Sequence, residues 1–212
     1  MTVHIKRGIS NCYLLTGEGG SILIDACGRS DASFLYENIK NQNVRLILLT
    51  HGHPDHTGAA SELARRLGAP VAMSREDAAL LQNPAGEALR AHTVAGRILK
   101  LATKSIMGTG KNAAFSPDVW LADGQDLSEY GVDGEVIALP GHTKGSVGVL
   151  TGAGDFFVGD AMFNLLRPTG SLVYENREEM DQSVGKIILS GAKRIWFGHG
   201  KPMPVEKLHP FR

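Results

Sequence analysis

The sequence predicts an α/β (α+β) fold for the 212-residue chain. Short apolar runs that end in turn residues recur along the sequence, and segments with helical spacing separate several of them. This alternation occurs in both halves of the chain, which predicts two sheets covered by helices in four layers. The length favours one domain, residues 1–212, over two.

The first half combines strands with helices. TGEGG is predicted to form the turn that joins the first two strands, Pro54 suits a first helical turn, and Gly68 ends an apolar helical stripe. The predicted elements, in chain order, are strands at Val3–Leu15 and Ser21–Ala26, a helix at Ser30–Lys40, a strand at Val44–Thr50, a helix from Pro54 to Gly68 and a strand at Pro70–Met73.

A helical, cap-like insert is predicted around residues 75–115, interrupted at QNPAG. It holds more apolar residues than one helix face needs, so we expect it to line a substrate pocket or to contact another subunit, as in a homodimer. The alternative is that the insert only covers the sheet. The rest of the chain is mostly strand. The predicted strands are VWLAD, GEVIALP, SVGVLTG, DFFVGD and RIWFGHG, with a helix at Arg177–Leu189.

The composition excludes several partner classes. Lys plus Arg and Asp plus Glu both number 22, so no overall charge attracts nucleic acid or an anionic membrane. The apolar runs are too short to span a bilayer, and the first residues lack the layout of a signal peptide. Cys12 and Cys27 are too few for a disulfide framework, so we expect a cytoplasmic protein.

The stretch LILLTHGHPDHTGAA carries three of the chain's eight histidines and an aspartate within six positions. His-x-His-x-Asp-His would arise by chance in roughly one chain in two thousand of this length. The cluster lies where a buried strand passes into a helix, which is a usual place for a site in an α/β layer.

Three further stretches, ALPGHTKGS, FFVGDAMF and IWFGHGKPM, each place a polar residue directly after a strand. Together with the first cluster they give seven nitrogen and oxygen ligands and no cysteine, which is more than one structural zinc needs. Two ions that share a bridging carboxylate suit this number better and leave positions open for water. The seven candidate metal ligands are His51, His53, Asp55, His56, His142, Asp160 and His199.

The chain resembles the metallo-β-lactamase superfamily from SILIDA through THGHPDH, GHTKGS, FFVGDAMF and FGHG, in the family's order. The resemblance implies an αβ/βα sandwich and two divalent ions, with zinc expected first and iron or manganese as alternatives. His51, His53 and His142 would hold one ion, Asp55, His56 and His199 the other, and Asp160 would bridge them. Asp25 matches a family aspartate close to the metals.

The implied activity is hydrolysis by a hydroxide that the two metals activate, with Asp55 or Asp160 as the catalytic carboxylate that holds or moves the proton. Two divalent ions outweigh two aspartates and one hydroxide, so the site favours a small anionic substrate or a carbonyl oxygen that becomes anionic. An ester, a thioester or a lactone is the expected bond.

The chain differs from particular branches of the superfamily, and these differences narrow the predicted activity. Asp160 stands where the true β-lactamases of this fold have cysteine or lack the bridge, and Phe163 stands where lactonases have tyrosine. Only thirteen residues follow His199, so the glutathione-binding domain of glyoxalase II is not expected. A compact glyoxalase II-like hydrolase remains. The alternative is a persulfide dioxygenase-like oxidoreductase with one iron on His51, His142 and Asp160.

Overall fold

The computed structural model describes residues 1–7, 9–83, 88–109 and 115–208 and forms two sheets and a separate hairpin. The first sheet contains, in spatial order, β1 (Thr2–Arg7), β2 (Ser10–Thr16), β3 (Ser21–Ile24), β4 (Val44–Leu48), β5 (Val71–Ser74) and β6 (Val119–Leu121). The second contains β13 (Met203–Pro204), β12 (Arg194–Trp196), β9 (Asp155–Phe157), β8 (Val147–Thr151) and β7 (Gly134–Ala138). The hairpin pairs β10 (Met162–Asn164) with β11 (Pro168–Gly170).

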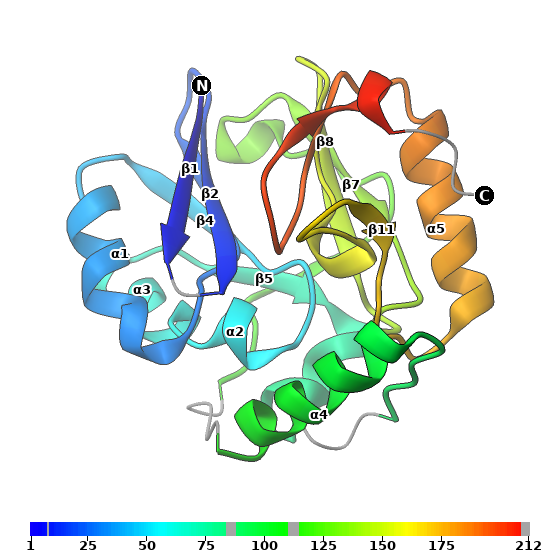
Figure 1. Cartoon of the computed structure of the whole chain (residues 1–212). Helices are drawn as coiled ribbons and strands as arrows, with labels where there is room; N and C mark the ends of the chain where they lie inside the picture. Colours follow the sequence, from blue (N-terminus) through cyan, green and yellow to red (C-terminus); the bar gives the residue numbers. More distant parts are fainter. Residues whose placement is uncertain (8, 84–87, 110–114, 209–212) are drawn as a thin grey trace.

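Helices cover the outer faces of both sheets (Figure 1). Helices α1 (Ala32–Ile39) and α3 (Ala60–Leu67) pack on the first sheet, and α5 (Arg177–Leu189) packs on the second. The predicted four-layer αβ/βα sandwich is therefore confirmed. The short α2 (Pro54–Thr57) and the long α4 (Val94–Thr109) lie below the sheets in Figure 1.

Three apolar cores fill the spaces between the four layers, and neighbouring residues of one strand contribute to different cores. Leu46 and Leu48 of β4 face the core between the sheets, whereas Ile47 faces the core under α1 and α3. In β9, Phe157 lies between the sheets and Phe156 lies under α5. Because side chains alternate along a strand, a strand buried on both faces is apolar throughout.

Helix boundaries follow local sequence signals. The Asn176 side chain accepts hydrogen bonds from the backbone of Glu178 and Glu179, which caps the start of α5. Helix α3 ends at Gly68, whose φ of 69° is in the left-handed region that favours glycine. These ends agree with the predictions for both helices.

Three predicted elements differ from the structure. Val3–Leu15 spans two antiparallel strands, β1 and β2, with Arg7 opposite Ser10, because apolar residues occur on both sides of the reversal and do not mark it. The helix after Pro54 is split into α2 and α3. Within the insert, η2 (Arg75–Leu81) is a 3₁₀ helix, and Arg90 is extended because its backbone pairs in both directions with Tyr174. Residues 84–87 and 110–114 of the insert lie outside the described residues.

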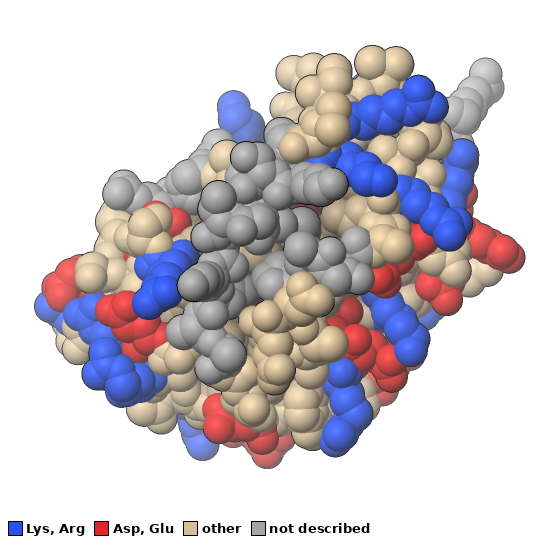
Figure 2. Space-filling view, turned by 90° about the horizontal axis from the view of Figure 1, so that it is seen from below, with Lys and Arg blue, Asp and Glu red and all other residues tan. Residues whose placement is uncertain are grey.

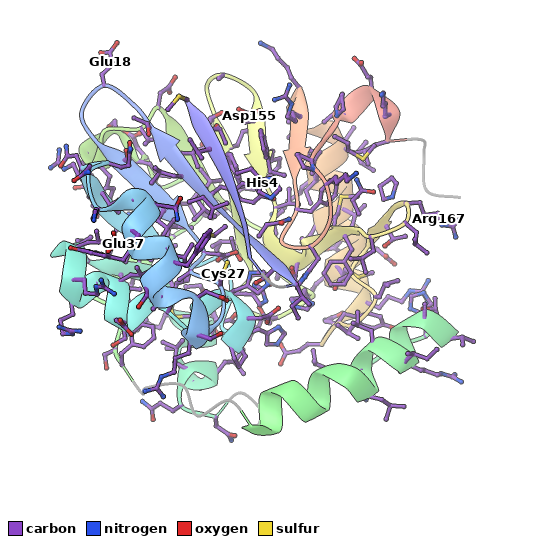
Figure 3. The ribbon with its side chains drawn as sticks, turned by 60° about the vertical axis from the view of Figure 1, so that its left-hand side comes forward. His4, Glu18, Cys27, Glu37, Asp155 and Arg167 are labelled. Carbon is purple, nitrogen blue, oxygen red and sulfur yellow. The ribbon has the colours of Figure 1, made fainter. Side chains whose placement is uncertain are left out.

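The surface is of mixed charge. On the face shown in Figure 2, Lys and Arg side chains are interspersed with Asp and Glu. The turn between β10 and β11 projects at the edge of the molecule, where Figure 3 shows Arg167 and where Leu166 is fully exposed. Within the described residues, no helix has the length and apolar character needed to cross a membrane.

The packing of Phe157 gives a stability prediction. Its ring is fully buried between the sheets, 5.1 Å from the Tyr13 ring and 5.5 Å from the Trp196 ring. We expect Phe157→Ala to lower the free energy of unfolding by about 3–5 kcal/mol, because it leaves a cavity in a packed core. Urea denaturation measures this loss. The exposed control Leu166→Ala should change it by less than about 0.5 kcal/mol, and equal effects of the two substitutions would contradict this account of the core.

Candidate metal centre

Four segments that follow strands bring the predicted ligands together. His51 and His53 lie in the loop after β4, and Asp55 and His56 lie in α2, which follows that loop. His142 follows β7, Asp160 lies in a short 3₁₀ helix after β9, and His199 follows β12. Within the described residues, three sets of side chains have ligand atoms that all lie within 4.8 Å of one another. These sets are His51, His53 and His142; His51, His56 and Asp160; and Asp55, His56 and His199.

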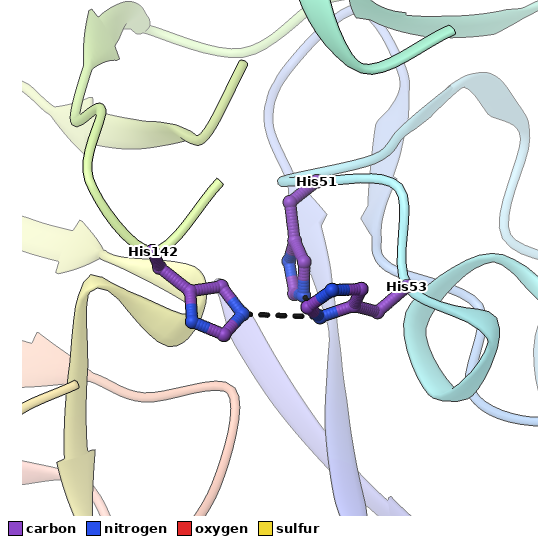
Figure 4. Close-up of side chains that lie close together, drawn as sticks. All are labelled: His51, His53 and His142. Atoms are coloured by element: carbon purple, nitrogen blue, oxygen red, sulfur yellow. Dashed lines mark hydrogen bonds between the residues drawn. The ribbon is translucent and has the colours of Figure 1, made fainter. Parts of the chain in front are cut away.

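The first triad consists of His51, His53 and His142, all buried (Figure 4). His53 Nδ1 lies 3.0 Å from His51 Nε2 and 3.1 Å from His142 Nε2. The three rings meet nearly at right angles, with interplanar angles of 82–89°. Three imidazole nitrogens therefore converge on one point from three directions.

The second triad consists of Asp55, His56 and His199. Asp55 Oδ2 lies 3.3 Å from His199 Nε2 and 3.6 Å from His56 Nε2. The two histidine Nε2 atoms lie 3.3 Å apart. This triad is closer to solvent than the first, because the side chains of Asp55 and His199 are 25% and 14% exposed.

Asp160 joins the two triads. Its Oδ2 lies 3.6 Å from His142 Nε2 and 3.2 Å from His199 Nε2. Its Oδ1 lies 3.5 Å from His56 Nε2, and no described residue donates a hydrogen bond to this buried oxygen. A buried carboxylate oxygen without a donor is costly unless a cation or water satisfies it.

Hydrogen bonds on the far side of the rings determine which nitrogens face the centre. His142 Nδ1 lies 2.8 Å from the Val173 carbonyl oxygen, and His199 Nδ1 lies 2.8 Å from that of Ile9. Because a carbonyl can only accept, both Nδ1 atoms carry protons. In the neutral imidazoles, each Nε2 therefore presents its lone pair to the centre, as a metal ligand requires.

Asp25 orients the rings of two further histidines through their outer nitrogens. Its Oδ2 accepts a hydrogen bond from His56 Nδ1 at 2.8 Å, and its carboxylate also accepts from the backbone N–H and hydroxyl of Thr50. Because the Thr50 hydroxyl donates to Asp25, its oxygen accepts from His51 Nδ1 at 3.1 Å. Asp25 thus contacts His56 directly and His51 through Thr50, close to the triads as the sequence predicts.

The two triads differ in electrostatics. Burial and the surrounding histidines hold the pKa of His51 well below its usual value, and burial also lowers the pKa of His53. Burial opposes the charged form of His56 too, but Asp160, Asp55 and Asp25 outweigh it and raise the pKa of His56 to about 9. The same carboxylates, Asp160 and Asp55, raise the pKa of His199 well above its usual value despite burial.

These observations fit a pair of cations. His51 and His53 of the first triad present neutral nitrogen donors, and the second triad holds protons among carboxylates where a cation would otherwise balance their charge. Burial raises the pKa of Asp160, but His199 and His56 outweigh it and lower the pKa to about 2. Nitrogen and oxygen donors without thiolate suit zinc, iron and manganese.

All seven predicted ligands lie in this one cluster, whereas His4 and His92 lie elsewhere. The His4 ring is hydrogen-bonded through Nε2 to Asn11 Oδ1 and stacks on the Tyr13 ring, and His92 contacts the Tyr174 hydroxyl. His209 lies outside the described residues. The supporting carbonyls of Ile9 and Val173 were not predicted, because a backbone acceptor leaves no residue-type signal in a sequence.

Comparison with known proteins places this cluster in a family context. The sequence model of the metallo-β-lactamase superfamily matches residues 5–199. The hydroxyacylglutathione hydrolase GloC of Haemophilus influenzae is 31% identical over 72% of this chain, and a hydroxyacylglutathione hydrolase of Anaeromyxobacter dehalogenans is 32% identical over 71%. The matched regions span 66% and 45% of those two proteins.

Solved structures share the fold. The BLEG-1 B3 metallo-β-lactamase superposes with a TM-score of 0.75 at 23% identity, over 98% of this chain and 95% of that protein. TTHA1623, crystallised in a di-iron-bound form, superposes with a TM-score of 0.72 at 22% identity over the full length of both chains.

The pKa difference between the triads predicts proton release on metal binding. His56, with a pKa of about 9, is protonated at neutral pH without metal, so a cation entering the second triad must displace a proton. The affinity of the second triad should therefore rise from neutral pH to about 9, where His56 loses its proton, and His199 should add to this rise because its pKa is also raised. His51 and His53 of the first triad have lowered pKa values and should contribute no such rise above neutral pH.

Titration calorimetry of the metal-free protein with Zn²⁺, in buffers of different ionisation enthalpy, counts these protons. We expect almost none for the first equivalent and at least one for the second. His56→Ala should lower the release by about one proton, because His199 also has a raised pKa, and His4→Ala, outside the cluster, should leave the release unchanged. Equal proton release by both equivalents would contradict the electrostatic difference between the triads.

Proposed function

The chain belongs to the metallo-β-lactamase superfamily, and we propose that it is a metal-dependent hydrolase of a small anionic thioester, ester or lactone. In this proposal the first triad holds one cation, the second triad holds another, and Asp160 bridges them. The position of Asp160 carries the proposal, since its carboxylate lies within 3.6 Å of a histidine nitrogen of each triad.

Two divalent cations at this position would supply a nucleophile from water near neutral pH and would polarise the carbonyl under attack. The chain contributes the surrounding groups. Asp25, Thr50 and the carbonyls of Ile9 and Val173 orient the imidazoles through their outer nitrogens. This orientation is present before any ligand arrives, so no rearrangement of these rings is needed.

Asp55 is the carboxylate that we assign to proton transfer with solvent. Its side chain is 25% exposed, compared with 5% for Asp160. Burial raises the pKa of Asp55, but His56 and His199 outweigh it and hold this pKa well below its usual value. Asp55 is therefore ionised at neutral pH, and its exposure gives it the contact with solvent that proton transfer requires.

Phe163 forms an apolar wall beside both triads. Its buried ring meets the His142 and His199 rings edge to face, at centroid distances of 6.2 and 5.4 Å. No hydroxyl is available at this position to bind a lactone, which favours acyclic substrates. We place thioesters first because the two relatives above, both more than 30% identical, are hydroxyacylglutathione hydrolases.

The arrangement favours two metals over the mononuclear alternative. A single iron on His51, His142 and Asp160 would leave His53, Asp55, His56 and His199 without a role, although all four lie in metal-binding sets. We propose zinc as the resident metal. Iron is the alternative that the metal analysis below distinguishes, since a structural neighbour was crystallised in a di-iron-bound form.

Metal content tests the dinuclear proposal directly. Protein purified and analysed by mass spectrometry of its metals should carry about two equivalents, and His199→Ala should lose one of them, because the second triad would keep only two ligands. The control His92→Ala should keep both. Saturation of the wild-type protein at one equivalent in excess zinc or iron would favour the mononuclear oxidoreductase instead.

Activity on a substrate panel tests the reaction. We expect turnover of anionic acyl thioesters, followed by esters and lactones, with little hydrolysis of phosphodiesters. Asp160→Asn should lower kcat/KM by about a hundredfold or more, because it removes the charge shared by both triads. The exposed Asp181→Asn is the matched control and should keep full activity. Retained turnover in Asp160→Asn with both metals bound would refute the bridging role.

A further inference from the structure

One buried carboxylate close to the centre does not belong to either triad. Asp77 lies on η2 at the start of the insert and is 1% exposed. Its Oδ2 accepts hydrogen bonds from the Gly52 backbone N–H at 2.9 Å and from the Thr143 hydroxyl at 2.7 Å. Its Oδ1 accepts from the Gly145 backbone N–H at 2.6 Å.

These partners belong to the two loops that supply the first triad. Gly52 lies between His51 and His53, and Thr143 directly follows His142. The two loops follow β4 and β7, which are in different sheets. Asp77 therefore links the two sheets at the point where their histidines meet.

Both loops approach η2 so closely that a side chain would collide with it. A Cβ added at Gly145 would lie 2.5 Å from Asp77 Oδ1, and one added at Gly52 would lie 2.6 Å from Leu80 Cβ. Glycine at these two positions lets the backbone N–H groups reach the carboxylate. The close approach and the three hydrogen bonds are parts of one arrangement.

We propose that Asp77 is a positioning residue that holds the His51–His53 loop against the His142 loop and so determines the cation affinity of the first triad. This inference depends on the metal centre of the proposed function. Asp77 is not itself a ligand in this proposal, because both of its oxygens already accept hydrogen bonds from these loops.

Because all three partners of Asp77 donate hydrogen bonds, replacing Asp77 with asparagine is a sensitive test of the link between the two loops. One Asp77 oxygen faces the N–H of Gly52 and the other faces that of Gly145. An asparagine side chain must turn its NH₂ group toward one of these two donors, which would break that bond and repel the loop. Asp77→Asn therefore disturbs the link with almost no change of volume.

The test isolates each triad in the full-length chain. In a His199→Ala background the first triad remains intact, and in a His142→Ala background the second remains intact. Zn²⁺ affinity in each background is measured by competition with a chromophoric chelator. We expect Asp77→Asn to weaken binding by about 10- to 100-fold in the first background and by less than about threefold in the second.

Asp118→Asn is the matched control, because Asp118 also accepts a hydrogen bond from a backbone N–H, that of Val71, away from both ligand loops. It should change neither affinity. Thr143→Val removes one of the three bonds and should weaken the first triad less than Asp77→Asn does, while Thr143→Ser should restore it. If Asp77→Asn folds poorly, the two Thr143 variants still test the link between the loops.

The outcomes separate this inference from the proposed function. Unchanged Zn²⁺ affinity in the first background, or equal weakening in both, would overturn the positioning role even if thermal stability falls. A protein that binds two cations with this dependence on Asp77 but hydrolyses no member of the substrate panel would support Asp77 and refute the hydrolase. Absence of cation binding in the wild-type protein would overturn both.

Discussion

The centre depends on the hydrogen bonds that fix the outer nitrogen of each imidazole. Four of the five histidines are held in this way, by a carboxylate, a hydroxyl or a backbone carbonyl. Without these acceptors, the rings could turn and present N–H groups to one another, and the convergence of lone pairs would be lost. The acceptors come from segments far apart in the chain, so the fold must be complete before the donor set exists.

The two triads show how carboxylates divide one cluster into two kinds of donor set. The first triad has histidines around a buried point, and burial lowers the pKa of His51 and of His53. The second triad lies among Asp25, Asp55 and Asp160, and their charge retains protons on its histidines. The same residue type therefore has opposite pKa shifts within a few ångströms, because the neighbouring charges differ.

The sequence predicted the parts of the site that depend on residue type and strand position. His142, Asp160 and His199 each follow an apolar strand, and strand ends that meet at one edge bring such residues together. It did not predict Asp77, because its role comes from the close approach of η2 to two loops that are distant in sequence. The helical prediction around Arg90 was wrong because tertiary pairing with Tyr174 outweighed local spacing.

Burial of β4 on both faces has a consequence for strand alignment. Along Leu46–Leu48 both faces of β4 are apolar, so a shift by one residue replaces one apolar side chain with another, and the hydrophobic pattern discriminates weakly between alignments. Hydrogen bonds to Asp25 select one alignment of β4 over the others. Its carboxylate, at the end of β3, binds the N–H and hydroxyl of Thr50, just beyond β4, and a shifted strand would leave these buried polar groups without partners. The carboxylate that orients His56 thus also fixes the register of the two neighbouring strands β3 and β4.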